Sequence, residues 1–423
     1  MSQTTEIQDA APEGYKRVQL GPKTLPVPTD WEIKRVDEIT ENLDRKRDPI
    51  KSSERDSGDV PYYGATGQVD SVSGYLFDEK LVLVGEDGAD WSPFGGTSYI
   101  ISGKSWVNNH AHVLRCTKIV EEFLSNYLDY IEMRQVISGT NRGKLNQSEL
   151  NQFPVLYPPL PEQRRIADVL STVDEQIQQT DELIEKTKEL KRGVTQDLMS
   201  TGINHDSYAE QRIGPIEVRV PANWDVRSLS DICTEVRNGF VGSATQYYTD
   251  DEDAIPYLQS NNVRRNKIDT NKLVRISKKF DQENPGTRVY TGNLLTVQSG
   301  HIGETCIVPE RFDGANSHAI IISRLETEIA SPKFVSHWLN STMGKKVINA
   351  ITVGSTVKHI NVTDFRKIEI PLPEINEQRK IGNILTKLGD MSDEERARKS
   401  KLKQIKRGLI QDLLTGKVRV NTN

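Results

Sequence analysis

Few residues of this chain have the types and spacing that bond-making chemistry requires. Residues 103–105 are Gly-Lys-Ser, as at the end of a phosphate-binding loop, but the first glycine of such a loop is replaced by Ser98. The Glu-x-Lys pairs at 32–34 and 189–191 resemble those of nucleases. Neither has a convincing Pro-Asp upstream, and a chain with 27% charged residues produces such pairs by chance. We therefore expect neither a phosphate-binding loop nor a nuclease site.

The histidines and cysteines also argue against catalysis. His110 and His112 lie on one face of an expected strand, as two metal ligands would. Only His110 has a counterpart in the second half of the chain, His318, so packed or hydrogen-bonded histidines are the favoured interpretation. The three cysteines are odd in number and far apart, which excludes a zinc knuckle and a disulfide framework. We expect no bond-making chemistry in this chain and no metal site.

Length and composition indicate a globular protein of at least two domains. The chain has 423 residues, of which 35% are hydrophobic, and each half is long enough to bury its own core. No apolar run approaches the roughly 18 residues that a membrane span needs. The N-terminal segment is polar and acidic without the apolar core of a signal peptide, so we expect a frayed leader in a cytoplasmic protein.

Basic residues gather in two local clusters, although the net charge of the chain is −5. Any nucleic-acid contact must therefore come from such clusters rather than from a globally basic domain. For either cluster taken alone, a solvated loop is as good an interpretation as a DNA-binding site. The two clusters, however, occupy corresponding places in the two halves. The first comprises Arg45, Lys46, Arg47, Lys51 and Arg55, and the second Arg264, Arg265, Lys267, Lys272, Arg275, Lys278 and Lys279.

The elements that would position these residues are present twice. Residues 162–197 align without a gap with residues 377–412 at an offset of 215, and 12 of the 36 positions are identical. Both segments open with Glu-Gln-Arg and close with Lys-Arg-Gly-x-x-Gln-Asp. Shorter matches precede them, including Pro-x-x-Trp at 28–31 and 221–224 and Asn-x-His-Ala at 108–111 and 316–319. A repeat of this length predicts two similar domains.

Before the repeated helical segment, each half has short apolar runs punctuated by Gly, Asn and Asp, which predict strands joined by turns. A helix with apolar residues at helical spacing follows, and a Pro-rich boundary ends the last strand. We expect strands at 80–85, 98–102 and 111–116 in the first half and at 294–298, 304–308 and 319–323 in the second. The helices are expected at 120–137 and 332–350.

Two long helices are expected after the Pro-rich boundaries, near whose starts Glu162 and Glu377 suit the helix macrodipole. The first has an unbroken heptad pattern, and the second is apolar at both ends and polar in the middle, so the two should pack on each other. Packing of each helix on its own domain is the alternative. The pattern comprises Ile166, Leu170, Val173, Ile177, Thr180, Ile184, Thr187, Lys191, Val194 and Leu198, and the second helix has Ile381, Leu385, Leu388, Ser392, Glu395, Lys399, Leu402, Lys406, Leu409 and Leu413.

Glycine recurs near the end of each long helix, as Gly193 and Gly408. A glycine inside a helix costs about 1 kcal/mol relative to alanine. Two equivalent glycines therefore predict close backbone approach, either between the two helices or to a partner protein. A hinge or the end of the helix is the alternative.

Taken together, the two variable domains and the two matching helices resemble the specificity subunit of a type I restriction–modification enzyme over essentially the whole chain. The duplicated Pro-Leu-Pro…Glu-Gln-Arg boundary and the Lys-Arg-Gly-x-x-Gln-Asp-Leu ending carry the resemblance. It implies an α+β fold with two similar recognition domains, separated by two long helices packed as an antiparallel coiled coil. The corresponding segments are residues 1–157 and 204–370 for the domains and 158–203 and 371–423 for the helices.

The resemblance also implies the partners. Each domain would recognise one half of a split, asymmetric sequence in double-stranded DNA. Two methyltransferase subunits would bind the helices and the adjoining domain faces, and restriction/translocase subunits would complete the nuclease. The chain itself would bind no cofactor, since S-adenosylmethionine would belong to the methyltransferase and ATP with Mg²⁺ to the motor.

The candidate DNA contacts are the basic loops, an aromatic-glycine turn and two polar loops before the last strands. They comprise Arg45, Lys46, Arg47, Lys51, Tyr62, Tyr63, Lys144, Arg264, Arg265, Lys267 and Lys358. The candidate partner contacts are the repeated polar residues at the ends of the long helices. They comprise Gln163, Arg164, Gln196, Asp197, Gln378, Arg379, Gln411 and Asp412.

Two other hypotheses remain open. A non-catalytic coiled-coil scaffold would not need twin domains with different loops. A self-contained nuclease would need the motifs that are missing above. A self-contained methyltransferase would need a polar residue at the start of a loop such as Tyr157-Pro158-Pro159-Leu160 and a glycine-rich cofactor loop before it, and both are missing. Mapping modified adenines in host DNA with and without this gene separates the three hypotheses.

Overall fold

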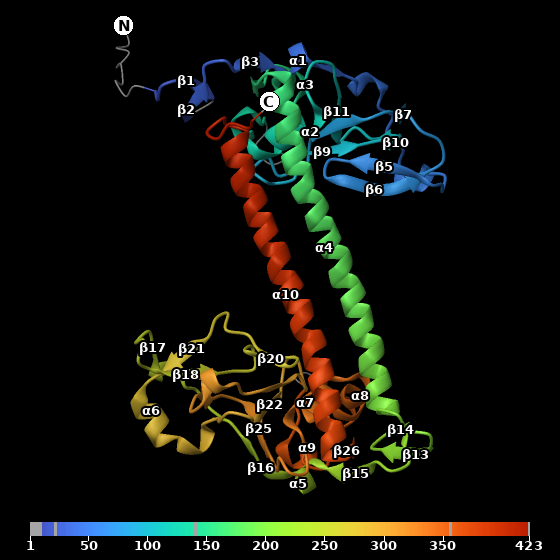
Figure 1. The fold of residues 1–423 in the computed structure, drawn as a ribbon, viewed down its shortest axis with the longest axis vertical. Helices are drawn as coiled ribbons and strands as arrows, with labels where there is room; N and C mark the ends of the chain where they lie inside the picture. The colour runs from blue at the N-terminus through green and yellow to red at the C-terminus, as the bar shows by residue number, and fades with distance from the viewer. Residues whose placement is uncertain (1–10, 21–22, 139–142, 355–357, 422–423) are drawn as a thin grey trace. The chain divides into compact units, whose positions relative to one another are not determined.

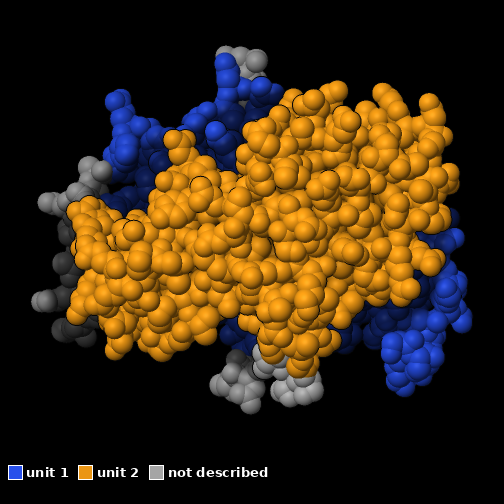
Figure 2. Space-filling view, turned by 90° about the horizontal axis from the view of Figure 1, so that it is seen from below, with its two compact units in different colours: residues 1–181, 397–423 blue, residues 182–396 orange. Residues whose placement is uncertain are grey.

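The computed structural model describes residues 11–20, 23–138, 143–354 and 358–421. The chain forms two compact units, residues 1–181 with 397–423 (unit 1) and residues 182–396 (unit 2), coloured separately in Figure 2. Each unit is rich in β-sheet and includes part of both long helices, α4 (Leu160–Thr201) and α10 (Ile375–Leu413) (Figure 1). The predicted α+β fold with two sheet-rich domains and long helices is confirmed.

Unit 1 contains two four-stranded sheets, in the orders β4-β11-β8-β9 and β6-β5-β10-β7, and two two-stranded pairs, β1-β2 and β3-β12. Its strands are β1 (Tyr15–Leu20), β2 (Lys23–Pro28), β3 (Glu32–Arg35), β4 (Thr40–Asn42), β5 (Val60–Gly64), β6 (Gly67–Val72), β7 (Phe77–Asp78), β8 (Leu81–Gly85), β9 (Ser98–Ile101), β10 (Lys104–Val107), β11 (Ala111–Cys116) and β12 (Pro154–Tyr157). Its short helices are α1 (Val36–Ile39), η1 (Asp44–Lys46), η2 (Ser52–Glu54), α2 (Glu121–Tyr130), η3 (Arg134–Val136) and α3 (Gln147–Asn151).

Strand β8 shows why these residues form a sheet with both faces covered. Its sequence, Leu-Val-Leu-Val-Gly, is fully buried, and successive side chains of a strand point to opposite faces. Val82 and Val84 therefore pack in the core that contains helix α2, while Leu81 and Leu83 pack in a second core with the neighbouring sheet.

Unit 2 repeats this arrangement with the orders β16-β25-β22-β23 and β17-β21-β18-β24, and adds the pairs β13-β14, β15-β26 and β19-β20. Its strands are β13 (Tyr208–Ile213), β14 (Ile216–Pro221), β15 (Asp225–Ser228), β16 (Cys233–Asn238), β17 (Tyr248–Thr249), β18 (Ile255–Leu258), β19 (Val263–Arg264), β20 (Lys267–Ile268), β21 (Val274–Ile276), β22 (Leu294–Val297), β23 (Thr305–Ile307), β24 (Asn316–Ser317), β25 (Ile320–Leu325) and β26 (Glu369–Leu372). Its short helices are α5 (Leu229–Ile232), η4 (Thr245–Tyr247), α6 (Lys278–Glu283), η5 (Pro285–Thr287), η6 (Glu310–Phe312), α7 (Pro332–Asn340), α8 (Thr342–Ala350) and α9 (Val362–Phe365).

The predicted strands match the structure closely, but the two predicted helices do not. The first ends at Tyr130 instead of residue 137, and η3 follows it. The second is interrupted at Ser341, whose hydroxyl accepts a hydrogen bond from the Gly344 backbone N–H at 3.1 Å and so caps a new helix, α8. The apolar spacing continues across the interruption and conceals it in the sequence.

Within unit 1, the first half of α4 and the last turns of α10 run antiparallel. Asp174 forms an ion pair with Lys406 at 2.7 Å, and Asp181 forms one with Lys399. The predicted heptad positions of both helices are buried or half-buried throughout, which confirms the two stripes. Among the described residues, no helix combines the length and apolar character that crossing a bilayer requires.

The start of α4 is held by the chain segment that follows α10. Glu162 is buried, and its carboxylate accepts hydrogen bonds from the Trp31 indole N–H at 2.9 Å and from the Arg419 guanidinium at 2.7 and 2.8 Å. Within unit 2, the carboxylate of Glu377 similarly accepts from the Ile203 backbone N–H and contacts the His205 ring, both at 2.8 Å. Each helix start is therefore fastened by the segment that follows the other helix.

We expect Arg419→Ala to lower the free energy of unfolding by about 2 kcal/mol, because it removes the cation facing a buried carboxylate that is only 3% exposed. Urea unfolding monitored by tryptophan fluorescence measures the change. Lys417→Ala is the control, since Lys417 pairs with Asp412 in a largely exposed position and should cost less than about 0.5 kcal/mol. Equal effects of the two substitutions would contradict this interpretation of Arg419.

Candidate DNA-binding and partner-binding surfaces

The first basic cluster of unit 1 divides into exposed residues and one residue that faces inward. Arg45 and Lys46 are exposed on η1, and Lys51 is exposed beside Glu54 at 3.4 Å. Arg47 instead donates hydrogen bonds to Glu86 at 2.5 Å and to the carbonyl of Ala111 at 2.8 Å. Arg47 therefore fastens the loop to the sheet, and the exposed cations remain candidates for phosphate contact.

The two tyrosines of the aromatic-glycine turn differ in exposure: Tyr62 is buried, whereas Tyr63 is half-buried and its DNA contact stays a prediction. Tyr62 is buried in β5, and its hydroxyl oxygen accepts a hydrogen bond from the Ile50 backbone N–H at 3.0 Å. Tyr63 packs against Tyr99 with ring centroids 6.1 Å apart. The prediction that Tyr62 contacts DNA is wrong, because a buried ring cannot reach a groove. Its repeat partner, Tyr257, is also buried, so the shared Pro-Tyr reflects the core.

The polar loops before the last strands lie partly outside the described residues, at 139–142 and 355–357. Lys144 is half-exposed, and its ammonium lies 2.8 Å from Glu86. Lys358 is exposed. Both lysines stay candidates for phosphate contact.

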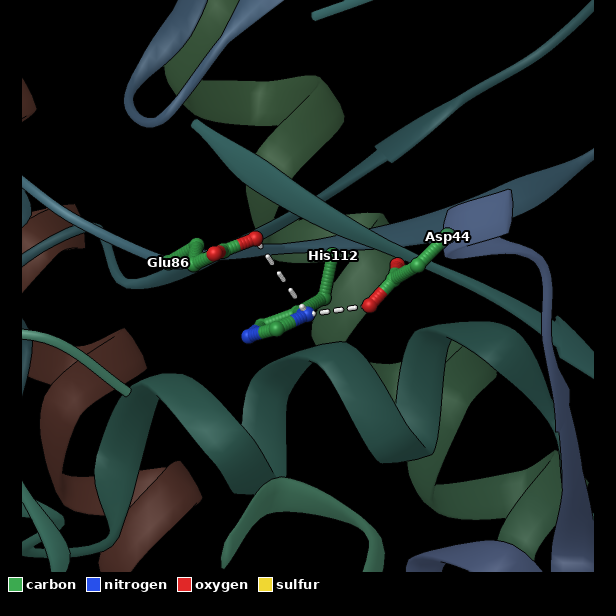
Figure 3. Close-up of side chains that lie close together, drawn as sticks. All are labelled: Asp44, Glu86 and His112. Carbon is green, nitrogen blue, oxygen red and sulfur yellow. Dashed lines mark hydrogen bonds and ion pairs between the residues drawn. The ribbon is translucent and has the colours of Figure 1, made fainter. Parts of the chain in front are cut away.

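Asp44, Glu86 and His112 are the described side chains whose spacing fits a metal ion (Figure 3). The ring nitrogens of His112 and the carboxylates of Asp44 and Glu86 already have hydrogen-bond or ion-pair partners within the protein. The His112 ring lies 2.6 Å from Asp44 through Nδ1 and 2.8 Å from the Leu145 carbonyl through Nε2. The cations of Arg47 and Lys144 also face Glu86. The set is a buried ion-pair network rather than a metal centre, and the predicted hydrogen-bonded histidine is confirmed.

Ionisation supports this assignment. Burial by itself would raise the pKa of Asp44, but the hydrogen bond from His112 and the nearby Arg47 charge lower it overall. The pKa of Glu86 is likewise lowered against the effect of burial, by its hydrogen bonds with Lys144 and Arg47. Both carboxyl groups are therefore carboxylates at neutral pH.

The second basic cluster begins with a two-stranded hairpin, β19-β20, in unit 2. Arg264 donates a hydrogen bond to the Val263 carbonyl at 3.0 Å and contacts His301 at 2.9 Å, while Lys267 contacts Asp393 of α10 at 3.2 Å. Arg265 at the turn is largely exposed, 3.5 Å from Glu304. Asn266 occupies the turn with a φ of 61°, a conformation that asparagine tolerates. Arg265 is therefore the most accessible cation of this hairpin.

Two of the predicted partner contacts are buried. The Gln163 side chain accepts from the Val120 backbone N–H at 3.1 Å and donates to the Pro158 carbonyl at 2.8 Å. Gln378 accepts from Ser331 at 2.8 Å and donates to the Pro373 carbonyl at 2.7 Å. The prediction that these two amides contact a partner is wrong. They fasten each long helix to its own unit, and for this reason they recur in both halves.

We expect Gln378→Leu to destabilise unit 2 by about 2 kcal/mol, because it leaves the buried Ser331 N–H and the Pro373 carbonyl without their partner. Urea unfolding of the purified chain measures the loss. Gln411→Leu, an exposed glutamine on the same helix, should change the free energy of unfolding by less than about 0.5 kcal/mol. A smaller loss for Gln378→Leu than for Gln411→Leu would contradict the anchoring role.

The remaining predicted partner residues are accessible. Arg164 and Arg379 are exposed near the helix starts, although Arg379 also approaches the Thr327 carbonyl at 3.4 Å. Gln196, Asp197 and Gln411 are exposed near the helix ends. Asp412 is half-buried and pairs with Lys417 at 2.9 Å.

The two helix glycines lie on the exposed side of their helices. A Cβ built on Gly193 or on Gly408 meets no atom within 4 Å. The expected close approach between the two helices is therefore wrong. Neither glycine marks the helix end, since α4 continues to Thr201 and α10 to Leu413. Close approach to a partner protein stays a prediction.

An exposed apolar residue, which sequence reasoning missed, accompanies each glycine. Leu190 is 55% exposed, three residues before Gly193, and Ile405 is 44% exposed, three residues before Gly408. Residues three or four positions apart are neighbours on a helix surface. We define two repeated faces, face A in unit 2 and face B in unit 1. Face A comprises Leu190, Gly193, Gln196 and Asp197, and face B comprises Ile405, Gly408, Gln411 and Asp412.

The signal for these apolar residues was present in the sequence. Both stand outside the heptad stripes, at the same offset of 215 as the glycines. A single exposed apolar residue is common on protein surfaces, but its recurrence at equivalent positions makes faces A and B candidates for partner binding.

Comparison with known proteins gives one family match in each half of the chain. The family model "Type I restriction modification DNA specificity domain" matches twice, at residues 28–189 and 221–404. A putative type I restriction enzyme specificity subunit of Haemophilus influenzae is 29% identical over 374 residues, which cover 86% of this chain and 89% of that protein.

A type I restriction enzyme specificity subunit of Methanocaldococcus jannaschii is 22% identical over 419 residues, covering 94% of this chain and 95% of the relative. The crystal structure of a type I restriction–modification system S subunit from M. genitalium superposes with a TM-score of 0.63 at 14% identity, covering 94% of this chain and 98% of that one. At this identity the structural likeness supports the fold alone.

Proposed function

Because the chain belongs to the family of type I restriction modification DNA specificity domains, we propose that each unit recognises one half of a bipartite, asymmetric DNA sequence. In this proposal the chain is the non-catalytic specificity subunit. It binds two methyltransferase subunits, and restriction/translocase subunits join the complex. S-adenosylmethionine is held by the methyltransferase, and ATP with Mg²⁺ by the motor.

The observation that carries the proposal is a repeated scaffold with unrepeated loops. The sheet orders and the two helix faces recur in both units, while the basic segments differ. Unit 1 presents Arg45 and Lys46 on a loop, and unit 2 presents Arg265 on a hairpin. Two equal faces fit two copies of one partner, and two different loop sets fit two different base sequences.

The charge of the chain supports a proposal in which the methyltransferase supplies much of the affinity for DNA. Phosphate contacts supply most of the affinity for DNA, and their number scales with the cations presented. With a net charge of −5, this chain presents only local clusters. We therefore expect weak, salt-sensitive binding by the chain alone and tight binding only with the methyltransferase. Nanomolar specific binding by the purified chain alone would contradict this.

Mapping modified adenines in host DNA, with and without this gene, tests the proposal. We expect the deletion to remove methylation from one bipartite, asymmetric sequence. Re-expression of the intact gene is the control and should restore it. An unchanged methylation map in a host with active partner subunits would instead support a scaffold role.

A further inference from the structure

The buried network around His112 joins four segments of unit 1. Asp44 begins η1 and accepts from the Val113 backbone N–H at 2.9 Å, which ties the basic loop to β11. Glu86 follows β8, and its backbone carbonyl accepts from the Leu145 N–H at 2.8 Å. The His112 ring lies between the two carboxylates, as Figure 3 shows. Two of the joined segments carry candidate DNA contacts, Arg45 with Lys46 and Lys144.

The hydrogen-bond partners of His112 determine its charge. Nε2 faces the Leu145 carbonyl at 2.8 Å, which only accepts, and Nδ1 faces the Asp44 carboxylate at 2.6 Å. A neutral imidazole has a single N–H, so donating to both partners requires the imidazolium form. Asp44 and Glu86 are then balanced by His112 and Arg47, while Lys144 faces Glu86 from the surface.

Unit 2 supplies a donor to the equivalent backbone carbonyl without a charged side chain. The repeat counterpart of Leu145 is Ile360, and its carbonyl accepts from the neutral amide of Gln298 at 3.2 Å. The residue of β25 that takes the place of His112 is Ile321, which is buried and apolar and packs in the same core as Ile360. The charged network is therefore a property of unit 1 and is not required by the shared scaffold.

We propose that His112 is a positioning residue for DNA recognition by unit 1, holding the basic loop and the Lys144 segment in one fixed arrangement. This inference rests on the proposed function and deepens it. Loss of the His112 charge leaves two buried carboxylates facing one buried cation, and the two loops then separate. Because base contacts depend on fixed side-chain geometry, recognition fails in the half-site of unit 1 alone.

His112→Gln tests this in the complete complex, expressed in the host from the native gene. The substitution retains an amide donor for the Leu145 carbonyl but removes the charge. We expect methylation of the cognate sequence to fall roughly tenfold, with relaxed base preference in the half recognised by unit 1 and unchanged preference in the other half. Footprinting of the complex on its cognate duplex, with and without Arg45→Ala/Lys46→Ala, identifies the half that belongs to unit 1, because lost phosphate contacts reduce backbone protection in that half.

A rescue experiment distinguishes a positioning role of His112 from a role in stability alone. The double variant Asp44→Asn/His112→Gln removes one charge of each sign, and we expect it to restore methylation to within roughly twofold of the native level. His110→Gln is the matched control, since His110 is half-exposed in the same segment and its substitution should leave base preference unchanged.

Several results would overturn the inference. A loss that is equal for both halves and follows a lower Tm of the purified chain would make His112 a stability residue only. Unchanged base preference in His112→Gln, or no rescue by the double variant, would also overturn it. These results leave the proposed function intact, whereas a native gene that directs no bipartite methylation would overturn both.

Discussion

The double variant Gly193→Trp/Gly408→Trp should fold normally and lose the methyltransferase subunits of the proposed complex. A side chain at either position enters open space, since a Cβ meets no atom within 4 Å. The same side chain would collide with a partner helix that approaches the glycine closely. We expect co-purification with the methyltransferase to fall at least tenfold and host methylation to disappear. Pull-down with tagged methyltransferase and the adenine map measure the two effects.

The single variants sharpen this test, because faces A and B are equivalent. Gly193→Trp alone blocks face A and Gly408→Trp alone blocks face B. If the complex holds two methyltransferase copies as proposed, each single variant should retain one, which native mass spectrometry resolves. Retention of two copies in either variant would show that the corresponding glycine does not face the partner.

Alanine at the same two positions provides the control for folding. Gly193→Ala and Gly408→Ala should each stabilise the helix by about 1 kcal/mol, because alanine loses less backbone entropy than glycine. A methyl group is small, so binding should weaken much less than with tryptophan. If alanine and tryptophan weaken binding equally, helix flexibility rather than close approach explains the glycines.

Reversing charge on the exposed loops should weaken DNA binding through one unit at a time. Arg45→Glu with Lys46→Glu changes unit 1, and Arg265→Glu changes unit 2. All three side chains are exposed, so the substitutions should leave the fold unchanged. We expect binding of the methyltransferase complex to its cognate duplex to weaken roughly a hundredfold for the first pair, because two phosphate contacts are replaced by repulsion.

Salt dependence distinguishes lost phosphate contacts from misfolding. Loss of two phosphate contacts should reduce the slope of log K against log salt by about 2. Lys118→Glu changes the charge at another exposed position of unit 1 and should leave the slope nearly unchanged. An unchanged slope in the Arg45→Glu/Lys46→Glu variant would place the DNA elsewhere on unit 1.

Repetition in the sequence indicated which positions matter but not for what purpose. Gln163 and Gln378 recur because each buried amide satisfies backbone groups at the start of a long helix. Tyr62 and Tyr257 recur because they fill the cores of equivalent sheets. A residue can recur in both halves because folding requires it or because binding requires it. Only its burial in the structure distinguishes the two reasons.

The basic clusters show the same limit. Arg45 and Arg47 are two residues apart on one loop and carry the same charge, yet one faces solvent and the other faces Glu86. Periodicity does not predict this difference because the loop has no regular period. The position of Glu86, 39 residues further along the chain, decides it.

The amino-acid sequence by itself determined the duplication, the strand pattern, the heptad stripes of both long helices and the family. Each of these is a local or periodic property, which residue order records directly. Only the tertiary structure decided that two repeated glutamines are internal anchors and that two repeated glycines face outward. It also decided that His112 is enclosed by Asp44 and Glu86. These outcomes depend on contacts between segments distant in sequence, and such contacts exist only once the chain has folded.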